Sequence, residues 1–182
     1  NPWDAQAADD FEVPPGQTWT FSGAEWAVEW FPAPPPDPTA NITIFADNAG
    51  APGNPLFSES DRPIQPSDEV PGTWWVQVLE PPQFDPGKYW FLLEANCPIG
   101  TEMLIKESAA PRGDPYLWRN PGGAFGTSCS DWTPALQCLG SQPSVAIRLL
   151  GDVTEVGTPV GPIVSEPVYT PPTPRAGETF TV

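Results

Sequence analysis

The amino-acid sequence predicts an all-β protein, an antiparallel β-sandwich or jelly roll that carries an extended Pro-rich C-terminal arm. The chain has 28 prolines and 16 glycines among 182 residues, about a quarter of the total, against roughly 12% in an average protein. This composition excludes long helices, because proline breaks a helix and glycine destabilises it. With 39% hydrophobic and 12% aromatic residues, the chain still has enough apolar side chains to form a core.

The expected strands are short β-prone runs separated by clusters of Pro, Gly, Asn and Asp. Apolar and polar residues alternate in Thr18–Phe21 and Val145–Leu149, a pattern typical of strands with one buried face. Many short strands with turns between them indicate a sandwich or jelly roll. In chain order the expected strands are Gln17–Ser22, Trp26–Phe31, Asn41–Ala46, Thr73–Leu79, Lys88–Ala95, Glu102–Lys106 and Ser144–Leu150.

The segments between these strands have the composition of turns and stiff connections. Residues 31–38 contain five prolines in eight positions, which predicts a polyproline-like connection. Residues 47–55 and 85–87 supply the Gly, Asn and Pro that tight turns require.

The composition changes after Gly151, which divides the chain into a β-sandwich domain of residues 1–151 and an arm of residues 152–182. The arm has six prolines, no Trp and no Cys. Its residues 159–164 cannot form a central strand, because the two prolines in this run have no N–H to donate.

The arm nevertheless contains the alternating β-prone run Thr179-Phe180-Thr181-Val182. A single strand is not stable alone. It is therefore the first strand of a further domain, or a disordered end, or a strand that pairs with an open sheet edge in its own molecule or in a neighbouring one. Residues 161–169 are a second candidate for such pairing.

The charge excludes several classes of partner and of chemistry. Seven basic and 23 acidic residues give a formal charge of −16, which repels phosphate backbones and anionic lipids, so we expect neither nucleic-acid nor membrane-surface binding. The chain has no His, and therefore lacks the usual general base and the commonest metal ligand. No run is long and apolar enough to span a bilayer, and the first residues are not those of a signal peptide, so we expect a mature or trimmed product.

The three cysteines predict one disulfide and one free thiol. Cys129 and Cys138 bracket a polar, turn-rich loop that is short enough to be closed by a disulfide, which implies an oxidising compartment. We expect Cys97 to be buried as a small apolar side chain, although an intermolecular bridge or a reactive thiol is an alternative. A four-ligand zinc site of Cys and His is not possible with these residues.

Adjacent aromatic residues within expected strands point to opposite faces of a sheet, so one ring of each pair faces outward. Trp74, Trp75 and Trp90 are the candidates for exposed aromatic contacts. Three arrangements are possible for such an outward-facing ring. Loops of the same domain cover it, a partner or the arm covers it, or it stacks on a sugar ring.

Acidic and hydroxyl side chains offer weaker candidate sites. The loop acids Asp9, Asp10 and Asp47 are possible calcium ligands, although no EF-hand pattern supports them. No carboxylate pair lies in a recognisable hydrolase motif, and we predict that the protein is not an enzyme. Candidate glycosylation sites are the sequon residue Asn41 and the arm residues Thr170 and Thr173.

Several stretches of the chain together resemble a family of secreted bacterial jelly-roll-like β-sandwich domains, which occur in large extracellular and cell-surface proteins. These stretches are Ala7–Phe11, Val13–Trp19, Ile42–Asp47, Gly50–Gly53, Pro86–Trp90, Trp118–Pro121, Gly126–Cys129, Trp132–Pro134 and Cys138–Gly140. The resemblance implies a non-enzymatic role in display, adhesion or assembly, without assigned catalytic residues. The chain departs from the family where Cys97 lacks a partner in an earlier loop, and where the arm is not followed by a further module.

Together these patterns predict an extracellular or cell-surface protein without a required cofactor. The first functional hypothesis is a structural subunit of a surface filament or layer, a homopolymer or an assembly with other surface proteins, joined by strand addition of the arm. The alternative is a carbohydrate-binding or adhesive module of a larger secreted protein, with glycans as its partners.

Overall fold

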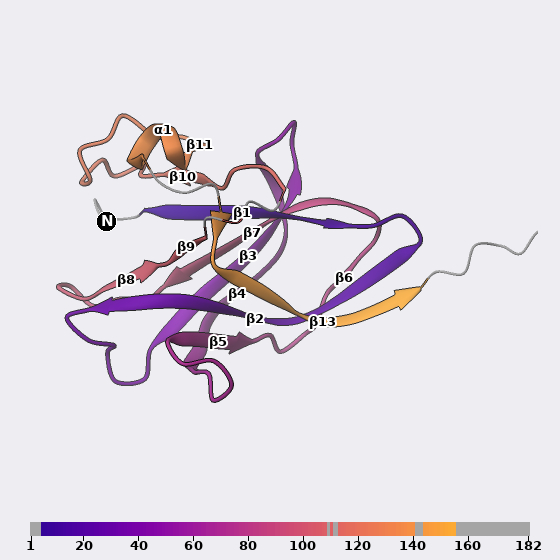
Figure 1. The fold of residues 1–182 in the computed structure, drawn as a ribbon, viewed down its shortest axis with the longest axis horizontal. Coiled ribbons are helices and arrows are strands. Elements are labelled where there is room, and N and C mark those ends of the chain that lie inside the picture. The colour runs from indigo at the N-terminus through magenta and orange to yellow at the C-terminus, as the bar shows by residue number, and fades with distance from the viewer. Residues whose placement is uncertain (1–4, 109, 111–112, 141–143, 156–182) are drawn as a thin grey trace, which may run out of the picture.

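The computed structural model describes residues 5–108, 110, 113–140 and 144–155, and in this part the chain is almost entirely β-structure (Figure 1). Its one described helix has five residues, in agreement with the high content of proline and glycine. The strands are β1 (Gln6–Val13), β2 (Gln17–Phe31), β3 (Thr39–Asp47), β4 (Pro52–Pro66), β5 (Thr73–Gln77), β6 (Gln83–Phe84), β7 (Gly87–Ala95), β8 (Glu102–Ile105), β9 (Glu107–Ser108), β10 (Leu117–Arg119), β11 (Thr133–Pro134), β12 (Ser144–Val145) and β13 (Ile147–Glu155), with helix α1 (Ala135–Leu139) after β11.

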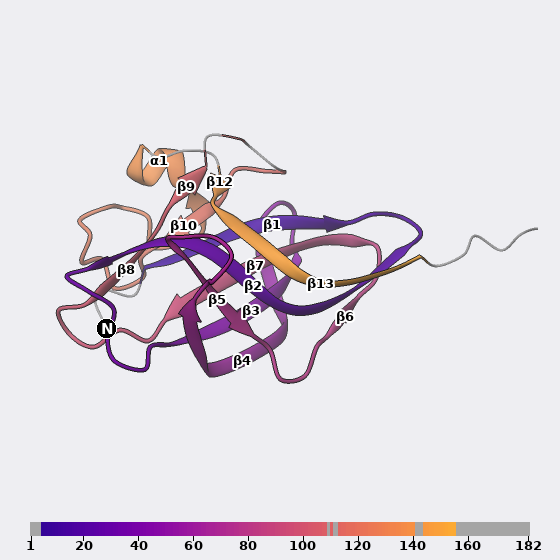
Figure 2. The same ribbon diagram turned by 60° about the horizontal axis from the view of Figure 1, so that its bottom comes forward.

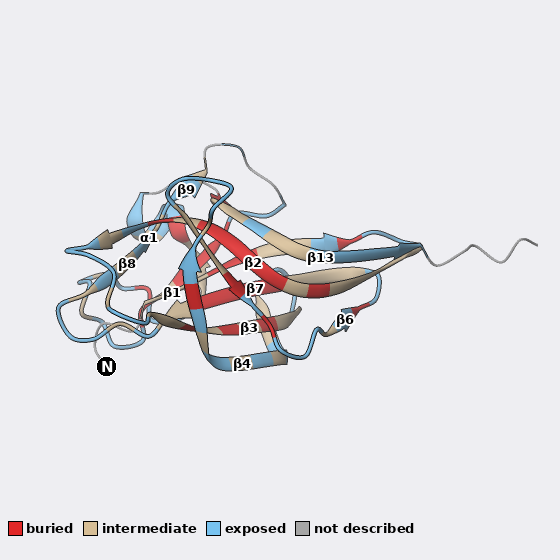
Figure 3. Cartoon of the chain, turned by 90° about the horizontal axis from the view of Figure 1, so that it is seen from below, coloured by how far each residue is buried: buried red, intermediate tan, exposed pale blue. Residues whose placement is uncertain are grey.

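The main sheet has the strand order β11-β10-β1-β7-β3-β4-β5-β2-β13, and all its pairings are antiparallel. Strands β6 and β8 pair with β2 outside this path, and β12 pairs with β9 in a separate small sheet. The path bends into two layers at β4, which pairs with β3 as far as Pro63 and with β5 from Ile64 onward. The change of direction in β4 is visible in Figure 3. The predicted all-β antiparallel sandwich is therefore confirmed.

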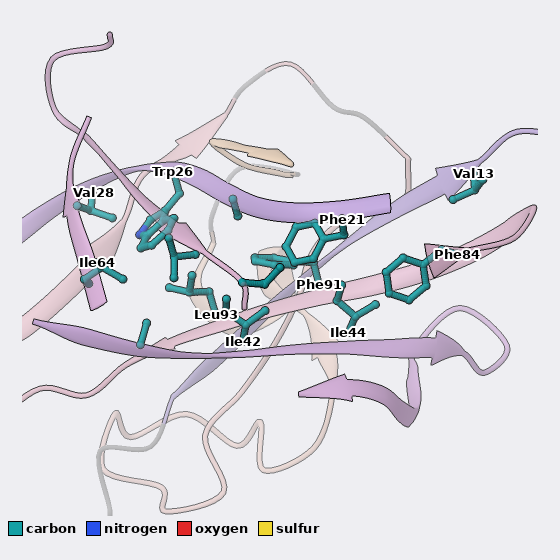
Figure 4. Packing of buried hydrophobic residues seen from close by; sticks show 14 residues of the cluster. Val13, Phe21, Trp26, Val28, Ile42, Ile44, Ile64, Phe84, Phe91 and Leu93 are labelled. Carbon is teal, nitrogen blue, oxygen red and sulfur yellow. The ribbon is translucent and has the colours of Figure 1, made fainter. Parts of the chain in front are cut away.

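The hydrophobic core lies between the two layers (Figure 4). Phe21 and Trp26 of β2 face Ile42 and Ile44 of β3, and the Phe21 ring meets that of Phe91 edge-on at 5.8 Å between ring centroids. Figure 3 shows that buried residues concentrate on β2, β3 and β7 in the middle of the molecule. In β3 the buried residues alternate along the strand, whereas β7 is buried over the four consecutive residues Trp90–Leu93, because both of its faces are covered.

Strand β2 is one continuous strand of 15 residues, whereas the sequence predicts two strands separated near Gly23. A Cβ at Gly23 would lie 2.3 Å from the carbonyl oxygen of Val76. The glycine therefore permits the close approach of β5 and does not end the strand.

Strands β1 and β4 are missed by the sequence prediction. The residues Asp9 and Asp10 interrupt the apolar pattern of β1, and β4 contains four prolines in 15 residues. β4 accommodates them because its pairing with β3 is irregular at three places, where β-bulges remove the need for a regular ladder of donors.

The predicted domain boundary at Gly151 lies inside a strand, and the sandwich continues to Glu155. β13 pairs with β2 over its whole length, with a bulge between Leu150 and Gly151. A Cβ at Gly151 would lie 2.0 Å from the carbonyl oxygen of Thr20, so only glycine fits this bulge. The predicted strand at Thr179–Val182 and the candidate glycosylation sites Thr170 and Thr173 lie outside the described residues.

A covering segment, residues 117–140, contains β10, β11, α1 and the loops between them. It includes the predicted disulfide between Cys129 and Cys138, which is confirmed with a Cα–Cα distance of 6.1 Å. The disulfide packs in a small cluster with Tyr116, Trp118 and Ala135.

In the described part of the chain, no helix has the length and apolar character that crossing a bilayer requires.

Candidate functional site

Several strand edges have no partner strand in the described part of the chain, and two of them, on β1 and β13, border one depression. On one side of β1, strand β10 pairs only with Gln6–Ala8, so residues 9–13 have no neighbouring strand there. Strand β13 pairs with β2 alone, and its other edge is open. In Figure 2, β13 runs at an oblique angle to β1.

Both open edges line one depression, which we call the edge groove. It has a volume of about 830 Å³ and is bordered by residues 9–12 of β1 and by residues 144–149 of β12 and β13. Trp26 and Phe91 of the sandwich core also line it. The groove therefore reaches from the solvent to the space between the two layers.

Next to the edge groove lies a smaller hollow, which we call the apolar pocket. It has a volume of about 150 Å³, and its main lining side chains are those of Phe11, Trp19, Phe84, Leu149 and Val153. The rings of Phe11 and Trp19 are nearly parallel, at 6.2 Å between centroids, while Phe84 meets Phe11 edge-on at 6.1 Å. Phe11 and Trp19 line both depressions, so the pocket opens beside the groove.

Asp9 is the buried acid of the edge groove, with 7% of the residue exposed. It has the same strand parity as Phe11 and Val13, and therefore faces the space between the layers. Its carboxylate accepts hydrogen bonds from the backbone N–H of Val145 at 3.0 Å and of Asp10 at 3.1 Å. Burial raises the pKa of Asp9 to about 7, although these two donors act in the opposite direction. The carboxyl group therefore changes its charge near neutral pH.

Asp10 points to the opposite face of β1, where it meets a basic side chain. Lys88 lies 3.1 Å from the Asp10 carboxylate and also forms an ion pair with Asp114. The backbone N–H of Asp114 donates to Asp10 at 2.9 Å. Burial raises the pKa of Asp10, while the hydrogen bond and the charge of Lys88 oppose this effect.

Glu25 is a second buried acid in the lining of the edge groove, but it does not face Asp9. It lies on the opposite face of β2 from the core residue Trp26, where it accepts a hydrogen bond from Thr73 at 3.0 Å and pairs with Arg148 at 2.5 Å. Hydrogen bonds from Ser67 and Thr73, together with the Arg148 charge, lower the pKa of Glu25 against the effect of burial. The two acids therefore do not form a pair of carboxylates across one substrate site.

The calcium candidates are not brought together. The sequence places Asp9 and Asp10 in a loop, which is wrong, because both lie in β1. Asp47, at the end of β3, accepts hydrogen bonds from Trp90 Nε1 at 2.8 Å and from the N–H of Gly50 at 3.2 Å. Over the residues that the structure describes, no group of three or more His, Cys, Asp or Glu side chains could hold a metal ion.

The prediction that Trp90 is an exposed aromatic is wrong, since its exposure is 0%. The ring does face outward from the sandwich, but the covering segment lies on this face and buries it with Ala8 and Leu117. Trp74 and Trp75 are half-buried, and the Trp74 ring packs against that of Trp30 at 5.3 Å between centroids.

The candidate glycosylation site Asn41 lies in β3, and its side-chain amide is hydrogen-bonded. Its Nδ2 donates to Asn96 at 3.2 Å, and its oxygen accepts from the backbone N–H of Asp61 at 3.0 Å.

Cys97 is a free thiol that is only half-buried, which differs from the expected full burial. Burial raises the pKa of this thiol.

No family model matches the chain, and neither the curated proteins nor the solved structures contain a match to it. The function must therefore be argued from the residues and from the open edges of the sheet.

Sequence reasoning missed the edge groove and the apolar pocket. The alternation of Phe11 and Val13 is a weak signal for β1, but the pair of aspartates before it hides the pattern. No local signal shows that the edges of β1 and β13 lie next to each other, because this depends on how the two layers pack.

Proposed function

We propose that the protein is an extracellular structural subunit of a surface filament or layer, in which the C-terminal arm of one copy adds as a strand to the edge groove of the next. The observation that carries this proposal is the pair of unpaired strand edges beside an apolar pocket. The disulfide supports an oxidising, extracellular compartment.

An open edge of the length of β13 is unusual unless a partner covers it. Its nine residues contain no proline, and Val153 is 54% exposed. Proteins normally shorten or block such edges, because the free N–H and C=O groups invite pairing with another chain. The bulge at Leu150 and Gly151 and the charged side chains of β13 limit unspecific pairing, while on both sides of the bulge this edge has no partner strand among the described residues.

Strand addition requires main-chain partners and pockets for alternate side chains. The edge of β13 supplies the main-chain groups, and the apolar pocket supplies a place for a side chain of the added strand. The donor, in the arm, and the acceptor, on the sandwich, are different surfaces. Contacts of this kind are head-to-tail and extend into fibres when they do not close into a ring.

The net charge of −16 makes random contact between copies unfavourable. Assembly must therefore depend on backbone hydrogen bonds and apolar contacts, because neither depends on the net charge of the two copies. At physiological ionic strength, salt largely screens the repulsion between charges that are more than about 8 to 10 Å apart. Assembly is therefore expected to become faster as salt is added.

The alternative function, a carbohydrate-binding or adhesive module, gains no support from a particular contact. It relied on three exposed tryptophans, of which Trp90 is buried and Trp74 packs against Trp30. It becomes the first hypothesis again if the protein does not assemble.

The test compares the full chain with a chain truncated after Glu155, by light scattering and negative-stain microscopy. Truncation after Gly151 is unsuitable, because it removes the last four residues of β13. The proposal expects filaments or large oligomers of the full chain and monomers of the truncated chain, with thermal unfolding of both as the control for folding. Monomers in both samples, over a range of salt concentrations, would overturn the proposal.

A further inference from the structure

We infer that the apolar pocket is the anchor site for one aromatic side chain of the added strand, and that this side chain is Phe180 of a second copy. The inference rests on the proposed function and deepens it, because it names the residue that fixes the register of assembly. It depends on three observations: the size of the pocket, its position on β13, and the distribution of prolines in the arm.

The pocket has the size and chemistry for a phenyl ring. An apolar cavity of about 150 Å³, lined by aliphatic and aromatic side chains, is large enough to hold benzene. The apolar pocket has this volume, and Phe11, Trp19 and Phe84 provide both ring faces and ring edges toward it. An entering ring can therefore adopt the offset or edge-to-face contacts that aromatic pairs prefer.

The pocket lies where an added strand would place its side chains. Leu149 and Val153 of β13 are part of its lining, so a strand on the free edge of β13 runs past its opening. Neighbouring strands are about 4.8 Å apart, and alternate side chains point to the same face. If Thr179–Val182 adds as a strand with Phe180 toward the pocket, this alternation puts Val182 on the same face and the two threonines on the solvent face.

The arm offers one aromatic residue in a segment that can form a full ladder. Among residues 156–182, Phe180 is the only Phe and no Trp is present. The single tyrosine, Tyr169, has prolines two residues before and two residues after it, and each proline removes a donor. Residues 175–182 contain no proline, and theirs is the longest such run in this part of the arm.

The distance from the end of β13 is sufficient for a neighbouring copy. Twenty-five residues separate Glu155 from Phe180, and an extended chain of this length spans about 80 Å. A domain of this size has a diameter of roughly 40 Å. The arm can therefore reach the pocket of a second copy. The experiments below distinguish this arrangement from one in which the arm folds back and Phe180 enters the pocket of its own molecule.

The first experiment measures binding of a fluorescent peptide of residues 173–182, with both termini blocked, to the full chain carrying Phe180→Ala. This variant keeps its arm but leaves the pocket free. We expect binding by fluorescence anisotropy, and affinity lower by about ten- to hundredfold for the peptide with Phe180→Ala, since a buried phenyl ring is lost. The control peptide with Thr181→Ala is expected to bind within about threefold of the original. No binding, or equal loss in both peptides, would overturn the inference.

The second experiment changes the pocket. Val153→Trp fills it with a larger apolar side chain, whereas Thr154→Trp, at the next position of β13, places the same ring on the opposite face. In the Phe180→Ala background, Val153→Trp is expected to weaken peptide binding at least about tenfold, and Thr154→Trp to leave it unchanged. Equal binding by both variants, with unfolding curves like that of the parent, would overturn the assignment of the pocket.

Assembly of the full chain separates this inference from the proposed function. Filaments that persist with Phe180→Ala and with Val153→Trp would overturn the anchor while leaving strand addition in place. A monomeric wild-type chain that still binds the peptide would overturn the assembly proposal while leaving the aromatic pocket. A monomer that binds the peptide only after Phe180→Ala would show that the arm occupies its own pocket, and would overturn the assignment to a second copy.

Discussion

Replacing Asp9 with asparagine removes a carboxyl group that the fold holds between its two layers, and should change how stability depends on pH. The folded pKa of Asp9 is about 7, above the ordinary value of 3.8. The folded state therefore keeps its proton at pH values where the unfolded chain has released it. The stability that comes from this proton is fully present below the unfolded pKa and is lost as the pH rises to about 7.

The size of the effect follows from the shift. One pKa unit corresponds to about 1.4 kcal/mol, so ionisation of Asp9 lowers the free energy of unfolding by at most about 4 kcal/mol between pH 4 and pH 8. Asparagine keeps one of the two oxygens that accept from the N–H groups of Val145 and Asp10, and it resembles the protonated acid in shape. The Asp9→Asn variant should therefore lack this part of the pH dependence.

The assay is urea unfolding of the wild type and the Asp9→Asn variant at each pH unit from 4 to 8. The two free energies of unfolding should be similar at pH 4. From there to about pH 7, the free energy of unfolding of the variant should rise relative to that of the wild type by about 1.4 kcal/mol per pH unit. Asp68→Asn, at an exposed position, is the control and should produce no such trend. If the wild type is the more stable protein at pH 8, or the difference does not vary with pH, the backbone donors hold Asp9 ionised and the reasoning is refuted.

Further predictions concern the disulfide, the acid on the outer face of β2 and the buried tryptophan. Reduction of the bond between Cys129 and Cys138 should lower the free energy of unfolding by about 2 to 3 kcal/mol, measured by urea unfolding with and without reductant. Glu25→Gln should destabilise the protein at pH 7 but not at strongly acidic pH, because a lowered pKa gives stability that is present above the ordinary value of 4.5 and lost as the pH falls through the folded value; an equal loss at both pH values would contradict this. Trp90→Ala should cost about 3 to 5 kcal/mol in thermal or urea unfolding, and the half-buried Trp75→Ala clearly less.

The parts of the fold that the sequence predicts are those with local signals. Short runs of β-prone apolar residues bounded by turn residues identify β3 and β7. The turn-rich loop between Cys129 and Cys138 identifies the disulfide, because a short loop brings the two cysteines within bonding distance.

The parts that the sequence does not predict depend on contacts between distant segments. Trp90 has the outward orientation that its position in β7 requires, but its burial depends on the covering segment, including Leu117 and Trp132. The edge groove depends on how the packing of the two layers places the edges of β1 and β13 next to each other. Prolines make β4 look like a loop, although tertiary pairing with β3 and β5 keeps it in the sheet.

The pairing of β13 with β2 also determines how the domain responds to mechanical force on its arm. The arm begins directly after Glu155, the last residue of β13, so a pull on the arm enters the domain at this end of the strand, and a pull along the strand loads its pairing with β2 in shear. Under such shear, the nine residue pairs with β2 carry the load together, whereas a pull across the strand would open them one after another. Resistance to force is set by the unfolding rate and not by equilibrium stability. Substitutions that loosen the β13–β2 ladder should therefore weaken the domain under tension far more than substitutions of equal thermodynamic cost in the covering segment.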